Sequence, residues 1–246
     1  GFMSPLSYYK VPYIFTSFGG SSFDYTVLTH EFGHAFQYSH SLQSKYLLAN
    51  GPSLDAVESF SMVMEIFAYP YVPMYFKQDS FKFYLDHLKA NIGQIINMCF
   101  GDEFQQVVYE NVDWTDGERN QAYLDLQKKY TLPIDKDNNP FLMEGNDWKS
   151  NSHFITIPFY YIDYGFAITI ALQLYKIMKV DYKKALDIYI KLCEQSAGLN
   201  LMKLIEITGL KSPFEEETIA ELAEFLKGEV EIAYANYTHS KQKAST

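Results

Sequence analysis

The stretch Thr29-His30-Glu31-Phe32-Gly33-His34-Ala35-Phe36 decides how the rest of the chain has to be arranged. Two histidines stand four residues apart, and a glutamate directly follows the first. Residues four apart on an α-helix share one face, so the imidazoles of His30 and His34 can reach one metal ion. Glu31 lies beside that face, where its carboxylate can handle a water molecule at the ion without binding the ion. The spacing therefore predicts a helix that carries a metal site.

Residues on both sides of this stretch favour the same helix. Asp24 is a predicted N-cap for a helix that begins near Tyr25 and fades around residues 39–41. Helical spacing is kept by the apolar residues Val27, Leu28, Phe32, Ala35 and Phe36. Residues 11–18 are β-branched and aromatic and run into Gly19-Gly20, which predicts a strand followed by a flexible loop.

The H-E-x-x-H spacing is typical of zinc peptidases, whose catalytic zinc takes three protein ligands and leaves a fourth position open. A third ligand is expected on a neighbouring element, and the next predicted helix carries Glu58 and Glu65 among apolar residues. These glutamates are two turns apart and share one face. If that face meets His30 and His34, one glutamate can bind zinc and the other can hold a ligand imidazole. Alternatively, both are solvent-facing residues of an amphipathic helix.

A second candidate cluster lies far along the chain, in residues 153–165. Tyr161 and Tyr164 are three apart on one helical face, Tyr160 is adjacent, and His153 just precedes the helix. A peptidase needs such donors to stabilise the oxyanion that forms from the attacked carbonyl. On composition alone, core packing with satisfied hydroxyls is the simpler explanation, because aromatic residues make up 17% of the chain.

Composition excludes some classes of function. The formal net charge of -10 argues against a nucleic-acid-binding protein, which needs a basic face. No stretch of 18 uninterrupted apolar residues occurs, so no association with a membrane is expected. Cys99 and Cys193 lack metal-ligand spacing and are expected to be reduced core thiols, which favours a cytoplasmic protein.

The remaining pattern is mostly helical. Capping residues predict helix starts at Ser53, Asn200 and Ser212. Helices are expected over residues 53–68, 79–111 (interrupted or bent near Gly93 and Gly101), 115–130, 158–180, from 181, 200–209 and 212–237, with one loop over residues 131–147. The predicted fold class is therefore mainly α, with a small β element near the N-terminus, and residues 1–246 are expected to form one catalytic domain.

Four stretches of the chain resemble the oligoendopeptidase F and thimet oligopeptidase family of zinc metallopeptidases, and the resemblance to the oligoendopeptidase F branch is close. In the family's order they are Pro12-Tyr13-Ile14-Phe15 with Gly19-Gly20; His30-Glu31-Phe32-Gly33-His34-Ala35-Phe36; Val57-Glu58-Ser59 with Glu65; and His153 followed by Pro158-Phe159-Tyr160-Tyr161-Ile162-Asp163-Tyr164. Alone, the first and third stretches are weak indicators of the family and the second is moderately specific. All four together are specific for it.

The resemblance implies a zincin-like catalytic helical domain that binds one Zn2+ ion per chain. Its ligands would be His30, His34 and Glu58, with Glu65 behind them. Glu31 would act as the general base and then as the general acid. The implied reaction is the hydrolysis of internal peptide bonds in short oligopeptides.

By the same resemblance, His153, Tyr161 and Tyr164 face the carbonyl and backbone of the substrate, with Tyr164 as the oxyanion donor. Tyr160 is a further expected substrate contact. The strand before Gly19-Gly20 would pair with an extended peptide by edge addition.

Members of this family usually carry a longer N-terminal part that forms the other wall of the substrate channel. The chain is therefore expected to be a catalytic fragment whose partner is the missing N-terminal half of the same protein. Two alternatives stay open: a zinc carboxypeptidase of the Taq type, and a non-catalytic helical binding module that keeps zinc for structure. Residues 158–164 favour the oligopeptidase over the carboxypeptidase. Glu31, which a structural zinc site does not need, argues against the binding module.

Overall fold

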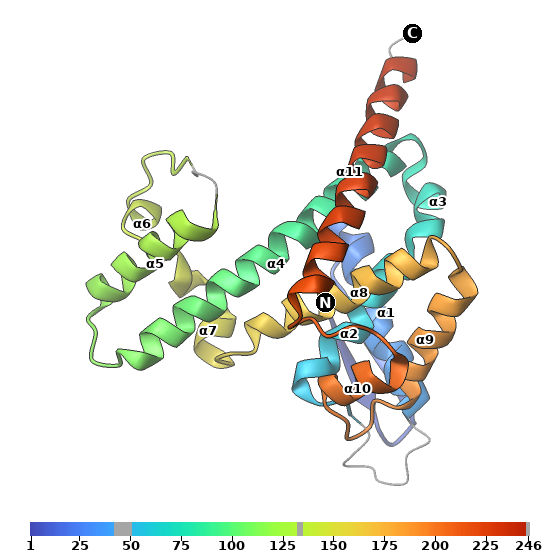
Figure 1. The fold of residues 1–246 in the computed structure, drawn as a ribbon, viewed down its shortest axis with the longest axis horizontal. Helices are drawn as coiled ribbons and strands as arrows, with labels where there is room; N and C mark the ends of the chain where they lie inside the picture. The colour runs from blue at the N-terminus through green and yellow to red at the C-terminus, as the bar shows by residue number, and fades with distance from the viewer. Residues whose placement is uncertain (42–50, 132–134, 245–246) are drawn as a thin grey trace. The chain divides into compact units, whose positions relative to one another are not determined.

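The computed structural model describes residues 1–41, 51–131 and 135–244, which divide into two compact units. The first unit comprises residues 1–91 and 166–246, and the second comprises residues 92–165. Two long helices, α4 (Ser80–Glu110) and α8 (Tyr161–Met178), run from one unit into the other. Most described residues are helical, which confirms the predicted fold class (Figure 1).

The first unit starts with a β-hairpin, β1 (Phe2–Leu6) and β2 (Val11–Phe15), paired antiparallel so that Phe2 faces Phe15. The prediction found β2 but missed β1. The other elements of this unit are α1 (Ser22–Ser41), α2 (Val57–Phe67), α3 (Val72–Phe76), α9 (Tyr182–Glu194), α10 (Leu201–Thr208) and α11 (Glu216–Ala244), with the 3-10 turns Leu54–Ala56, Tyr69–Tyr71 and Lys77–Asp79.

Helices α1 and α2 pack against each other in antiparallel directions, and α9 lies against both (Figure 1). Gly33 makes this contact close. A Cβ atom at Gly33 would lie 2.5 Å from the carbonyl oxygen of Phe60 and 2.6 Å from Cα of Ser61. Only a glycine in α1 therefore allows its backbone to touch that of α2.

Three side chains fasten α1 and α2 in this position. The hydroxyl of Tyr25, in the first turns of α1, donates to the carbonyl of Ala68 just past α2, at 2.9 Å. Tyr189 of α9 is fully buried and donates to the carbonyl of Phe60 at 2.9 Å. Buried Gln37 donates to Ser196 at 2.7 Å, which ties α1 to the end of α9.

A buried carboxylate joins α8 to α11. Glu229 accepts a hydrogen bond from Tyr175 at 2.6 Å and forms an ion pair with Lys179 at 3.0 Å. Elsewhere α8 is largely apolar, and its Ile168, Ala171, Leu172 and Leu174 are fully buried. The apolar run predicted as a buried helix over residues 158–180 is thus α8.

The second unit contains α5 (Asp116–Tyr130), α6 (Pro140–Met143), a 3-10 turn (Asp147–Ser150) and α7 (Ser152–Thr156), together with parts of α4 and α8. Helix α5 starts where a helix was predicted, at a capping box in which Thr115 and Glu118 bond each other's backbone N–H groups. A Cβ atom at Gly101 would lie 2.8 Å from the ring of Tyr161, so this glycine of α4 makes room for an aromatic side chain.

The starts predicted at Asp24 and Ser212 were wrong, whereas a helical turn does begin after Ser53 at Leu54, but without the predicted side-chain cap. Helix α1 begins at Ser22, before Asp24, and the Asp24 carboxylate accepts the N–H groups of the loop residues 19–21. Ser53 donates its hydroxyl to Leu199 and makes no cap. Ser212 bonds the N–H of Phe214, but α11 begins only at Glu216.

Other boundaries also differ from the prediction. Helix α4 is one continuous helix, without a break at Gly93 or Gly101. The predicted loop over 131–147 contains α6, although residues 132–134 fall outside the described part. Helix α11 continues beyond residue 237 to Ala244. Cys99 is exposed, which corrects its prediction as a core thiol, whereas Cys193 is buried, and both are free.

Among the described helices, none combines the length and the apolar character that crossing a membrane requires. The prediction that residues 1–246 form one catalytic domain stays a prediction.

Gly33→Ala should force α1 and α2 apart and lower the free energy of unfolding of the metal-free protein by about 2 kcal/mol or more, as for other overpacked cores. Gly228→Ala is the matched control, because Gly228 lies inside α11 with nothing within 4 Å of an added Cβ. That change should stabilise the protein by about 0.5–1 kcal/mol. Urea unfolding of the parent and both variants measures the difference, and a Gly33→Ala variant as stable as its parent would contradict the backbone contact.

Candidate metal centre

The first unit brings both motif histidines and one glutamate together. Nε2 of His30 lies 3.2 Å, and Nε2 of His34 lies 3.4 Å, from the same carboxylate oxygen, Oε2 of Glu58. The two imidazole rings are 5.0 Å apart between centroids and nearly perpendicular, at 82°. One ligand atom from each residue lies within 4.8 Å of the others, and no second group of this kind is found in the described part of the chain.

These distances fit a zinc ion. Zinc binds histidine nitrogen at about 2.0–2.1 Å and carboxylate oxygen at about 2.0–2.2 Å, so neighbouring ligand atoms of a tetrahedral site lie about 3.3–3.5 Å apart. The distances of Glu58 from His30 and His34 have this length. Glu58 is only 6% exposed, which excludes the alternative of a solvent-facing glutamate. The three residues therefore fit a zinc site with three protein ligands.

Glu65 orients the imidazole of His30 through a hydrogen bond with the ring nitrogen that faces away from Glu58. Its Oε1 lies 2.7 Å from Nδ1 of His30, on the side of the ring away from Glu58. A carboxylate can only accept, so Nδ1 carries the hydrogen, and in the neutral imidazole the lone pair is on Nε2. Glu65 thus selects the tautomer that can bind a metal beside Glu58.

Ser61 orients the Glu58 ligand. Its hydroxyl lies 2.9 Å from Oε2 of Glu58 and 2.9 Å from the Glu58 carbonyl oxygen, one turn back on α2. Ser61 is fully buried, so few other partners compete for its hydrogen. The contact restricts rotation of the carboxylate before any ion binds.

The cluster is a set of buried charges that stabilise one another. Burial by itself lowers the pKa of His30, but hydrogen bonds to Glu58 and Glu65 outweigh it and raise the pKa from 6.5 to about 10. Burial opposes ionisation of Glu58 and Glu65, yet hydrogen bonds from histidines hold the pKa of both carboxyls below its ordinary value. At neutral pH the metal-free cluster therefore contains two carboxylates and an imidazolium, and a divalent cation can replace that positive charge.

Glu31 follows the first ligand on α1 and lies beside the cluster in sequence. Its side chain packs against Gly1 at the start of the hairpin and is 8% exposed. Among residues 1–41, 51–131 and 135–244, no hydrogen bond or ion pair engages its carboxylate. The carboxylate is therefore available as a proton acceptor, which is what the predicted role requires.

The glycines predicted to bind substrate lie between β2 and α1. The N–H groups of Gly19 and Gly20 donate to Asp24, at 3.1 and 2.6 Å, and their role toward a substrate stays a prediction. Gly20 has a φ of 81°, which favours glycine. Among the described residues β2 pairs only with β1, and the pairing of its second edge with a peptide stays a prediction.

The second predicted cluster forms within the second unit. The His153 ring lies 5.6 Å from Tyr161, 5.7 Å from Tyr164 and 6.0 Å from Tyr160, between ring centroids. Tyr160 is buried, whereas the other two tyrosines are half-buried. Burial raises the pKa of Tyr161 against an opposing hydrogen bond with Asn151, which keeps its hydroxyl protonated as a donor must be. The roles of these residues toward a substrate stay predictions.

The turn that leads into this cluster is strained. Phe159 has a φ of 65°, a left-handed conformation that costs a bulky residue about 1–3 kcal/mol. The buried amide oxygen of Gln105 holds the turn by accepting the Phe159 N–H at 2.8 Å, and the Phe159 ring packs on Tyr109. This turn directly precedes Tyr160 and the start of α8 at Tyr161.

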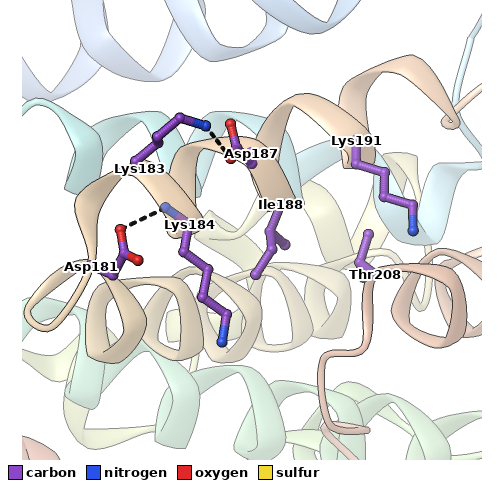
Figure 2. A pocket seen from close by; sticks show the side chains of 7 residues that line it. All are labelled: Asp181, Lys183, Lys184, Asp187, Ile188, Lys191 and Thr208. Atoms are coloured by element: carbon purple, nitrogen blue, oxygen red, sulfur yellow. Dashed lines mark hydrogen bonds and ion pairs between the residues drawn. The ribbon is translucent and has the colours of Figure 1, made fainter.

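A surface groove on the outer face of α9 is unrelated to this chemistry (Figure 2). Lys183 pairs with Asp187 at 2.6 Å, and Asp181 caps the helix by accepting the N–H of Lys184 at 2.9 Å (Figure 2). The amine of Lys191 donates to the carbonyl of Ile207. Most charged groups of the groove therefore already have a partner, through a helix cap, an exposed ion pair or a hydrogen bond to a carbonyl, as on an ordinary solvent-exposed helix.

Two residues that contact the site were not predicted. Ser61 lies in the predicted second helix, but a serine there reads as an ordinary small core residue. His87 has no candidate site residue near it in the sequence, yet its Nε2 lies 2.8 Å from Oε2 of Glu65. No periodicity connects His87 with Glu65, because they belong to different helices.

Comparisons with known proteins agree with this geometry. The model of peptidase family M3 matches residues 5–224. Among solved structures, PZ peptidase A with an inhibitor is similar at 37% identity and a TM-score of 0.90, over 94% of this chain and 41% of that chain. No curated protein sequence matches the chain.

Two further structures are assigned as oligoendopeptidase F. One has 34% identity and a TM-score of 0.89, over 94% of this chain and 41% of its own. The other, from Bacillus anthracis strain Ames, has 32% identity and a TM-score of 0.80, over 94% of this chain and 38% of its own. The chain therefore spans about 40% of the length of the structures that it matches.

Zinc binding at pH 7.5 should release about one proton per ion, because the metal must displace the proton of His30. In the metal-free protein, the stabilisation from protonated His30 is complete below pH 6.5 and is lost as the pH rises through about 10. Zinc affinity should accordingly rise between pH 6.5 and pH 10. Calorimetry in two buffers of different ionisation enthalpy measures the release, and zinc binding with no proton release would contradict the paired state of His30.

Proposed function

The chain belongs to peptidase family M3, and from this membership and the metal centre we propose that it is the catalytic part of a zinc-dependent endopeptidase that cleaves short oligopeptides. The observation that carries the proposal is the convergence of His30, His34 and Glu58 on one point, with Glu31 next to the first ligand. A bound zinc ion would supply Lewis acidity that polarises the scissile carbonyl and lowers the pKa of water to about 7.

Glu31 is the proposed general base and general acid. It takes a proton from the attacking water and later delivers it to the amine that leaves. Glu31 directly follows His30 in the sequence, and its carboxylate has no hydrogen-bond or ion-pair partner among the described residues. No other donor in the described part of the chain therefore occupies the carboxylate oxygen that would accept the proton. General acid–base catalysis of this kind contributes about 10²–10⁴-fold to the rate.

His153, Tyr161 and Tyr164 are the proposed donors for the substrate, with Tyr164 for the oxyanion. Their rings form one group in the second unit, and His153 is held by Asn151, whose side chain accepts its backbone N–H at 3.1 Å. Removing one oxyanion donor typically costs about 3 kcal/mol of barrier. Tyr160 is proposed as a further substrate contact.

The number of protein ligands favours catalysis over a structural zinc. A structural site is closed by four protein ligands, whereas a catalytic site keeps one position open. The cluster offers three residues in the described part of the chain, and Glu65 is used behind His30. A non-catalytic zinc module would have no need for Glu31.

We also propose that the whole protein completes the substrate channel with a segment outside this chain. The chain spans about 40% of the matching structures. Aromatic side chains of the hairpin are exposed, including Tyr13 at 47% and Phe15 at 49%, which a further segment or an extended peptide can cover.

Glu58→Ala should lower zinc affinity by more than about 100-fold, beyond the typical effect of outer-shell changes, and abolish cleavage of a quenched oligopeptide. Zinc content after dialysis measures the first effect. Glu229→Gln is the control for lost stability, because Glu229 is also a buried glutamate of the first unit but pairs with Tyr175 and Lys179. Stoichiometric zinc in Glu58→Ala would remove Glu58 from the site.

Glu31→Gln should retain stoichiometric zinc and lose about 10²–10⁴-fold in kcat toward the same peptide, because the amide cannot accept a proton. Parent and variant are compared at equal zinc content, so that the rate reports proton transfer alone. Glu194→Gln, an exposed substitution, should leave the rate unchanged. Undiminished cleavage by Glu31→Gln would overturn the catalytic assignment.

A further inference from the structure

A chain of buried hydrogen bonds continues from the metal centre into the first unit. Glu65 uses both carboxylate oxygens: Oε1 meets Nδ1 of His30 at 2.7 Å, and Oε2 meets Nε2 of His87 at 2.8 Å. On the far side of its ring, Nδ1 of His87 lies 2.7 Å from the hydroxyl of Tyr69. Asn91, one turn after His87 on α4, also approaches Nδ1, at 3.2 Å.

The partners of Asn91 fix the direction of every bond in this chain. The Asn91 side chain also meets the backbone carbonyl of His87 at 3.0 Å. A carbonyl only accepts, so the amide atom there is the nitrogen, a donor, and the nearby Nδ1 of His87 must accept. The hydrogen of the neutral His87 imidazole is therefore on Nε2, which donates to Glu65.

We propose that Tyr69 and His87 are positioning residues for the zinc site, which act through Glu65 to hold His30 in the tautomer and orientation that bind the metal. The proposal rests on the zinc site of the proposed function. Tyr69 donates to His87, His87 donates to Glu65, and Glu65 accepts from His30, so the lone pair of His30 is left on the nitrogen beside Glu58.

The surroundings make this chain rigid. Tyr69 is 5% exposed, and the side chain of His87 is 9% exposed. The ring of Phe83 stacks on His87 at 5.6 Å with a 9° angle between planes, and the Tyr84 hydroxyl donates to the Tyr69 carbonyl at 2.8 Å. These hydrogen bonds connect α1, α2, the turn after α2 and α4. The position of the His30 imidazole therefore depends on the packing of all four elements.

Without His87, the Oε2 atom of Glu65 would be buried and unpaired. A buried carboxylate oxygen without a donor is costly, so the Glu65 side chain would turn toward another donor or take up a proton. Either change weakens its hold on Nδ1 of His30. Outer-shell partners of metal ligands typically contribute about 10–100-fold to metal affinity.

The test compares zinc dissociation constants, measured by competition with a chromogenic chelator on the intact protein. His87→Ala should weaken zinc binding about 10-fold. Tyr69→Phe, which removes only one hydroxyl, should weaken it about threefold. His87→Gln should restore affinity to within about twofold of the parent, because its amide nitrogen can donate to Glu65 as Nε2 does.

Tyr175→Phe is the matched control, because it removes another buried tyrosine hydroxyl bonded to a glutamate, Glu229, in the same unit. It should lower thermal stability but leave zinc affinity unchanged. Zinc affinity of Tyr69→Phe and His87→Ala equal to that of the parent would overturn the inference, as would an equal loss in Tyr175→Phe. A parent protein that binds no zinc would instead overturn the proposed function, and with it this inference.

Discussion

Two buried carboxylates on α2 face the imidazoles of α1, and the first unit is organised to keep them paired. An isolated buried carboxylate is strongly unfavourable, so Glu58 and Glu65 are stable only while histidines lie within hydrogen-bond reach. The backbone contact at Gly33 provides this closeness, and Tyr25 and Tyr189 maintain it from both sides. The candidate metal centre is therefore a consequence of how two helices pack, and it would be disturbed by any change that separates them.

The same constraint explains which parts of the site were predictable. Helix periodicity alone places His30 and His34 on one face of α1 and Glu58 and Glu65 on one face of α2. The cost of burying a glutamate among apolar residues made a meeting of the two faces one of two open alternatives, and the family resemblance implied Glu58 as the ligand. His87 could not be predicted in this way, because its partner Glu65 belongs to another helix and only the tertiary structure joins them. The membership of peptidase family M3 confirms the resemblance, which rested on four short stretches taken together.

Helix boundaries were predictable from the sequence only where no other part of the chain binds the capping side chain. Thr115 and Asn200 cap helices at the predicted starts, because each lies in an exposed turn where only the local backbone competes for its side chain. Asp24 and Ser53 look equivalent in sequence but bond a preceding loop and a distant carbonyl. A helix cap contributes only about 1 kcal/mol, so a capping side chain forms a different hydrogen bond where the tertiary structure offers a stronger one.

The central claim is that three protein side chains hold one zinc ion and leave a position open for catalysis. X-ray absorption spectroscopy at the zinc edge of the loaded protein tests this claim most directly. The account predicts two imidazole nitrogens at about 2.0–2.1 Å and carboxylate and water oxygens at about 2.0–2.2 Å, with one imidazole signal missing in His34→Ala. A site closed by four protein ligands, or a spectrum unchanged in His34→Ala, would contradict it.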